Sequence, residues 1–199
     1  IAISLESSSI QIYAFDPLLE KLECVRHLDN IDGMSLSRPS NGAISFDMDL
    51  LAISNLTGKT DFYLVESSSS IYPQPVFSIN TQMAHGVRFA RDNRFLASAS
   101  LTNGVEIYSL SHSPRLHQAL GNPFAPLRPK SIDFSLDGRF AVVGFCYMLT
   151  NLVSPKECGV IAVYKFDEKS GFIDPVPVFQ TDAVDSVETL VFHPHGDAI

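Results

Sequence analysis

The sequence predicts an all-β fold built from repeated four-stranded antiparallel sheets, and two observations support this prediction. First, a motif of an apolar residue, one spacer, Phe and a polar turn occurs four times, with its Phe at positions 46, 89, 134 and 192. Second, short β-prone runs follow each copy, without helical periodicity. The Phe spacings of 43, 45 and 58 residues indicate a repeat that tolerates one insertion, which a loop absorbs at small entropic cost.

Each repeat contains four segments with strand character. The first is the motif itself, at 44–49, 87–92, 132–137 and 190–196. The second is a small apolar run, at 1–4, 51–54, 96–99 and 140–143. The third combines β-branched residues with Tyr, at 10–13, 105–108, 161–164 and less faithfully 62–64. The fourth is looser, at 22–28, 75–79, 116–120 and 176–179. Four short strands per period are the pattern of a β-propeller blade.

One segment has a competing local pattern. Asp16 and Pro17, followed by Leu18, Leu22 and Val25, have the spacing of a capped amphipathic helix. Because residues 13–16 match residues 164–167, the repeat predicts a turn and an outer strand instead.

The repeat divides the chain into about four blade equivalents. We predict the end of one blade at 1–30, blades at 41–80, 84–124 and 129–180, and the start of a further blade at 187–199. The chain thus begins in a second strand and ends in a first strand. This phasing fits a ring of four whose last blade is shared by both ends, or a window of a larger propeller. We expect the window, because four blades make a strained, narrow ring.

Composition excludes several classes of protein. The 199 residues are 45% hydrophobic and 18% charged, which is typical of one folded domain and not of a disordered chain. A net charge of −8 argues against nucleic acid as a partner. The longest apolar run, 140–149, is about half the ~20 residues of a membrane helix, so we predict a soluble protein with no membrane insertion, cytoplasmic or periplasmic/extracellular.

Segments 85–97 and 132–142 resemble the bacterial WD40-like, YVTN and lactonase-like β-propeller repeats, and the similarity covers essentially the whole chain. WD40 repeats place Trp-Asp at the end of the third strand, whereas this chain has no Trp and carries Tyr13, Tyr108 and Tyr164 nearby. That difference favours the YVTN and lactonase-like side. The resemblance implies a family of sugar lactonases, surface or periplasmic proteins and members of no known activity, and it transfers no chemistry by itself.

The equivalent positions that enter the first strands predict a candidate ligand site. Four residues before the motif Phe stand Gly42, His85, Lys130 and Glu188. In a propeller these positions ring one mouth of the central channel, so we expect His85, Lys130 and Glu188 to line it. They would form either a ligand-binding or acid/base set, or an ordinary polar rim.

Other residues suggest weaker hypotheses. Cys146 and Cys158 flank the insertion 147–159 and would form either a disulfide or two separate thiols, and the insertion itself would be a lid or a plain surface loop. The His193-Pro194-His195 triplet invites a metal site, but His195 aligns with the turn residues Asp49, Asp92 and Asp137. We therefore predict no metal and no cofactor.

No catalytic motif stands out, so the sequence favours a non-enzymatic propeller module that binds another protein or a sugar-like small molecule at the channel mouth and loops. The first alternative is a lactonase-like hydrolase, with Glu188 or His85 as base and Lys130 stabilising the oxyanion. The second is an architectural propeller domain of a larger protein.

Overall fold

The computed structural model describes residues 2–5, 10–28, 39–67, 70–71, 74–147, 159–183 and 187–193, and this part of the chain contains strands but no helix. The first sheet consists of β1 (Ala2–Leu5), β2 (Ile10–Asp16) and β3 (Lys21–Leu28). The second consists of β4 (Pro39–Ile44), β5 (Leu50–Asn55), β6 (Lys59–Ser67) and β8 (Phe77–Asn80), with the short β7 (Ser70–Ile71) paired further along β6.

The third and fourth sheets each have four antiparallel strands in chain order. They are β9 (Ala84–Phe89), β10 (Phe95–Ser100), β11 (Gly104–Ser109) and β12 (Arg115–Gly121), then β13 (Arg128–Phe134), β14 (Phe140–Cys146), β15 (Gly159–Asp167) and β16 (Phe172–Ala183). The predicted all-β fold of four-stranded antiparallel blades is therefore confirmed.

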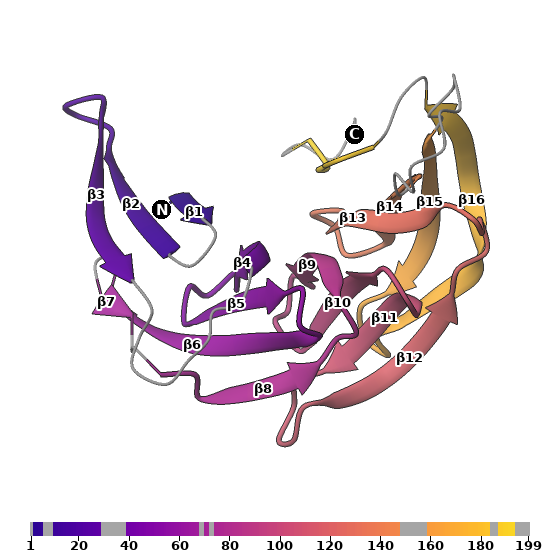
Figure 1. The fold of residues 1–199 in the computed structure, drawn as a ribbon, viewed down its shortest axis with the longest axis horizontal. Coiled ribbons are helices and arrows are strands. Elements are labelled where there is room, and N and C mark those ends of the chain that lie inside the picture. The colour runs from indigo at the N-terminus through magenta and orange to yellow at the C-terminus, as the bar shows by residue number, and fades with distance from the viewer. Residues whose placement is uncertain are drawn as a thin grey trace.

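The four sheets follow one another around an open arc (Figure 1). The first strands β4, β9 and β13 lie side by side on its concave inner side, and the last strands β8, β12 and β16 lie on its outer side. This is the radial arrangement of propeller blades. A meeting of the two ends in one sheet, which is the alternative to the expected window, would involve Ile1, Ala198 and Ile199, and these lie outside the described residues.

The core lies between the sheets. One cluster joins the third and fourth sheets: it combines Phe95 and Ile107 of the third with Phe134 and Phe166 of the fourth, and the last two rings have centroids 4.6 Å apart. A second joins the second and third sheets, where the Phe62 ring stacks on Phe77 and meets the edge of Phe89. Each blade thus buries its apolar faces against its neighbours.

The segment with the competing helical pattern forms a hairpin, as the repeat predicted. β2 ends at Asp16, residues 17–20 form a turn, and β3 begins at Lys21. The Asp16 carboxylate accepts hydrogen bonds from the backbone N–H groups of Leu18 (2.8 Å) and Leu19 (3.2 Å). The predicted helix cap is therefore used to close a turn, and long-range strand pairing overrides the local propensity.

The repeat predicts that the motif residues Phe46, Phe89, Phe134 and Phe192 are buried at the same place in successive blades, and this prediction is wrong for Phe46. Phe89 and Phe134 are 3% and 5% exposed, but Phe46 is 53% exposed. Backbone bonds show why: the N–H groups of Ser45, Ala90 and Ser135 donate to the carbonyls of the residues five positions on. Ile44 is therefore the counterpart of Phe89 and Phe134, and Phe46 lies in the turn. The true spacing is 45 residues in both steps.

The turn between the first and second strands explains the polar part of the motif. In the fourth sheet the Ser135 hydroxyl donates to Asp137 Oδ1 (2.7 Å) and accepts from the Phe140 N–H (2.9 Å). Ser45 makes the same pair of bonds with Asp47 and Leu50. The turn residue of the second sheet is thus Asp47, whereas the sequence alignment placed Asp49 there.

The fourth motif copy differs from its predicted form. Residues 187–193 make no strand, and the backbone N–H groups of Leu190 and Phe192 donate to the Ser131 Oγ (3.0 Å) and Asp133 Oδ2 (2.7 Å) side-chain atoms. In this segment, hydrogen bonds to side chains of β13 therefore take the place of the backbone-to-backbone hydrogen bonds of a strand pair. Phe192 is half-buried and packs against the cluster that contains Val187 and Leu190.

Candidate functional site

Three of the first strands carry a β-bulge at the same repeat position. The ladder between each first strand and its neighbour skips one residue, and these residues are Ser40 in β4, His85 in β9 and Lys130 in β13. A bulge removes its residue from regular pairing and re-aims the side chain. The sequence alignment paired Gly42 with His85 and Lys130, and the 45-residue register replaces Gly42 with Ser40.

The structure brings Lys130 and Glu188 together. Lys130 Nζ forms an ion pair with Glu188 Oε2, and the two side chains are 25% and 62% exposed. Glu188 belongs to the segment 187–193, which packs on β14 at Gly144. A Cβ at position 144 would run into the Val187 side chain, so the glycine is what lets this segment approach. The ion pair thus links the fourth sheet to the segment that follows it.

His85 belongs to the same electrostatic neighbourhood. Burial lowers its pKa below the usual 6.5, and the positive charge of Lys130 lowers this pKa further, while Glu188 opposes both. The imidazole is therefore neutral at pH 7, with one nitrogen that donates a hydrogen bond and one that accepts. His85, Lys130 and Glu188, which we call the mouth residues, thus influence one another electrostatically, and their role as a ligand site stays a prediction.

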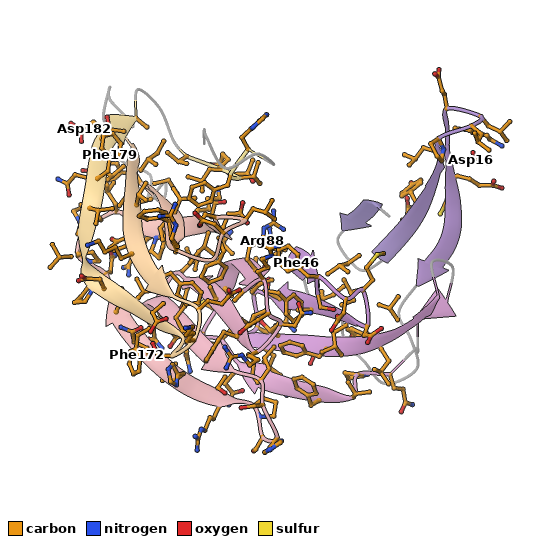
Figure 2. The ribbon with its side chains drawn as sticks, turned by 180° about the vertical axis from the view of Figure 1, so that it is seen from behind. Asp16, Phe46, Arg88, Phe172, Phe179 and Asp182 are labelled. Carbon is orange, nitrogen blue, oxygen red and sulfur yellow. The ribbon has the colours of Figure 1, made fainter. Side chains whose placement is uncertain are left out.

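A second charged pair, which sequence reasoning missed, lies along the same inner strands. Arg88 Nε is 3.4 Å from Asp133 Oδ1, and the other oxygen of Asp133 accepts from the Phe192 N–H. Burial raises the pKa of Asp133, although the Phe192 N–H and Arg88 both favour its ionised form. Figure 2 shows Arg88 on the concave side of the arc. The signal was available: Arg88 and Asp133 follow His85 and Lys130 by three residues each.

Several sequence hypotheses fall on residues that the structure does not describe. Cys158 of the proposed disulfide, residues 148–158 of the insertion, and Pro194 and His195 of the metal triplet lie outside the described ranges. Cys146 is buried in β14. Within the described ranges, no group of three or more His, Cys, Asp or Glu side chains is placed to hold a metal ion. No helix of the same ranges has the length and apolarity to span a membrane.

Comparison with known proteins identifies the fold. No family model and no curated protein matches the chain. Among solved structures, the β-propeller domain of Cps50 (Swd1) from Myceliophteria thermophila is similar with a TM-score of 0.60 and 11% identity, over 96% of this chain and 54% of that chain. Hydrazine synthase from Kuenenia stuttgartiensis is similar with a TM-score of 0.58 and 13% identity, over 89% of this chain and 44% of that chain.

At these identities the likeness establishes a β-propeller fold and nothing finer, so the YVTN and lactonase-like resemblance gains no support from it. The chain spans about half the length of both similar structures.

Proposed function

We propose that this chain forms part of a β-propeller that acts as a binding module, with the mouth residues His85, Lys130 and Glu188 as its ligand site. The observation that supports the proposal is that the bulge residue Lys130 forms an ion pair with Glu188, and that both charges act on the second bulge residue, His85. The similarity to propeller domains supports an interaction or architectural module in general. Bulges near a site commonly re-aim side chains for such a role.

The charges of the site indicate which ligand it fits. Lys130 and Glu188 neutralise each other, and His85 is neutral at pH 7, so the mouth has hydrogen-bond donors and acceptors but no net charge. A polar, uncharged segment of a partner protein matches this set, and a neutral sugar-like molecule is the alternative with the same chemistry. Strongly anionic ligands such as nucleic acid do not match it.

The test compares probes and variants. A phage-displayed library of random peptides and a panel of neutral monosaccharides are screened against the wild type, Lys130→Gln and His85→Ala, with Lys169→Gln as the control. Lys169 lies in the turn between β15 and β16, away from the mouth. We expect peptide binding that both mouth variants weaken at least tenfold and the control leaves intact. Binding that all variants retain equally would overturn the proposal.

A lactonase-like hydrolase is the second candidate, favoured by the same three residues, which combine an acid, a base and a cation. The ion pair weighs against it, because Lys130 Nζ and Glu188 Oε2 occupy each other and leave neither free for a reacting carbonyl or water. A panel of sugar lactones assayed with the wild type and Glu188→Gln separates the candidates. Hydrolysis that Glu188→Gln abolishes favours the hydrolase, whereas equal activity in both proteins rules out Glu188 as the base.

A further inference from the structure

The fourth sheet carries an open surface at the end opposite the mouth. β13 carries Lys130 near its start and ends at Phe134, and the turn at 135–139 leads into β14. Arg139 is the last residue of this turn, Phe140 is the first of β14, and Lys165 on β15 is paired opposite Phe140. We call Arg139, Phe140 and Lys165 the basic-aromatic surface. It borders a hollow of about 700 Å³, whose walls also include Phe172 and Pro175. Figure 2 shows Phe172 at one end of β16 and Phe179 toward the other.

The counterpart of this surface in the third sheet is covered by the next blade. Arg94 Nη2 donates to the backbone carbonyl of Glu168 (2.9 Å), in the turn between β15 and β16. The Glu168 carboxylate in turn accepts from the backbone N–H of Asp92 (3.1 Å). Gly171 of the same turn lies directly on the Phe95 ring, where any Cβ would overlap the ring atoms. Under this turn Phe95 is only 6% exposed.

In the third sheet, Asp92, Arg94 and Phe95 receive the turn, and the fourth sheet has the same three residue types 45 positions later, at Asp137, Arg139 and Phe140. Arg94 Nε pairs with Asp92 Oδ2, and Arg139 Nε pairs in the same way with Asp137 Oδ2 (2.6 Å). The guanidinium groups lie 5.5 Å from the Phe95 centroid and 5.4 Å from the Phe140 centroid. The two receiving surfaces therefore have the same internal geometry.

The two surfaces differ in their cover, and also in the residue paired opposite the Phe, which is Ser109 for Phe95 and Lys165 for Phe140. The Arg139 side chain is 72% exposed against 51% for Arg94, and Asp137 is 46% exposed against 24% for Asp92. Among the described residues, no other sheet donates to or accepts from the Arg139 side chain, and the Asp137 N–H has no acceptor. The surface is thus preorganised for a turn that the described residues do not supply.

We propose that the basic-aromatic surface binds a hairpin turn of a partner β-sheet that has the chemistry of the 167–171 turn. A backbone carbonyl would accept from Arg139, a carboxylate at the second turn position would accept from the Asp137 N–H, and a glycine at the fifth would lie on the Phe140 ring. Arg139 pairs with Asp137, as Arg94 of the covered surface pairs with Asp92, and Lys165 adds a cation beside Asp167 and Asp174 of the hollow. The match to the turn therefore rests on the hydrogen-bonding groups and the Phe140 ring more than on net charge.

The first sheet of a second copy does not fit this requirement. Its β2–β3 turn also has an Asp side chain that closes it, and Glu20 has a φ of +49° where Gly171 has +76°. However, Glu20 places a Cβ where the glycine is needed against Phe140, and Pro17 replaces the carboxylate of Glu168. The 13–22 segment is therefore a natural decoy for the test.

The experiment uses a backbone-cyclised peptide of residues 164–173 as the probe and the ¹⁵N-labelled full chain as the receptor. We expect chemical-shift changes at Asp137, Arg139 and Phe140, and at least tenfold slower hydrogen exchange of the Asp137 N–H. Arg139→Glu should weaken binding at least tenfold. Lys169→Glu makes the same charge change outside the hollow and should leave binding unchanged.

Peptide variants make the outcome decisive. Substituting Gly171→Val in the peptide, or using the cyclised 13–22 segment, should abolish the shifts. The proposal is overturned if a peptide with verified hairpin contacts causes no change, if Arg139→Glu and Lys169→Glu weaken binding equally, or if the 13–22 peptide binds as well. Self-association of the 199-residue chain that Arg139→Glu abolishes would also overturn it. If the peptide holds no hairpin, exchange of the Asp137 N–H is measured in a chain extended at residue 199 by a second copy of 128–183, with and without Gly171→Val in that copy.

Discussion

Truncation of two motif phenylalanines tests the 45-residue register directly. Phe134 is 5% exposed and packs on Phe166 with ring centroids 4.6 Å apart, whereas Phe46 is 53% exposed in a turn. Phe134→Ala leaves a cavity between the third and fourth sheets and should cost about 3 to 5 kcal/mol of unfolding free energy. Phe46→Ala removes a ring that is already half in water and should cost about 1 kcal/mol or less.

Urea unfolding followed by far-UV circular dichroism and tyrosine fluorescence measures both costs, since the chain has 6 Tyr and no Trp. With an m-value of roughly 2 kcal/mol per molar urea, the midpoint of Phe134→Ala should fall by about 1.5 to 2.5 M, and that of Phe46→Ala by about 0.5 M or less. Equal losses in the two variants would refute the register and restore the alignment that made Phe46 equivalent to Phe134.

Three further predictions follow from individual side chains. The pKa of His85 is lowered in the folded state, so its contribution to the free energy of unfolding is fully present above about pH 6.5 and is lost as the pH falls below that value. His85→Gln should therefore make stability depend less on pH in this acid range, and an NMR titration of His85 should have a midpoint below 6.5. Buried Glu106 accepts from Asn103 (2.9 Å) and Tyr108 (2.8 Å), so Glu106→Gln should cost within about 1 kcal/mol and Glu106→Ala at least about 2 kcal/mol in urea unfolding. Asn55 fits the N-glycosylation pattern but is 3% exposed, and its side-chain oxygen accepts hydrogen bonds from the backbone of its own turn. Mass spectrometry of protein secreted from a eukaryotic host should therefore find no glycan there, and a glycan at Asn55 would contradict this burial.

Much of the fold was predictable from the sequence because local chemistry repeats with it. The Ser-x-Asp turn of the fourth sheet closes through its own side chains, and the β-branched and Tyr-containing run at 161–164 has strand propensity by itself. The equivalence of His85 and Lys130 was also readable, since both lie 45 residues apart at the start of a first strand.

Tertiary structure alone decided the register of the second blade and the partners of the site. Phe46 matched the motif in letters, but only the bond from Ser45 N–H to the Leu50 carbonyl shows that the turn begins two residues earlier than the alignment placed it. A side-chain period of two makes such shifts invisible to hydrophobic pattern alone. The sequence aligned His85, Lys130 and Glu188 at one repeat position, and the structure has a bulge at His85 and Lys130 but no strand at Glu188. Tertiary packing alone decides that Lys130 meets Glu188, and that the Arg94–Phe95 pair is covered while the similar Arg139–Phe140 pair is more open. These contacts join residues 58 or 74 positions apart and leave no local signal.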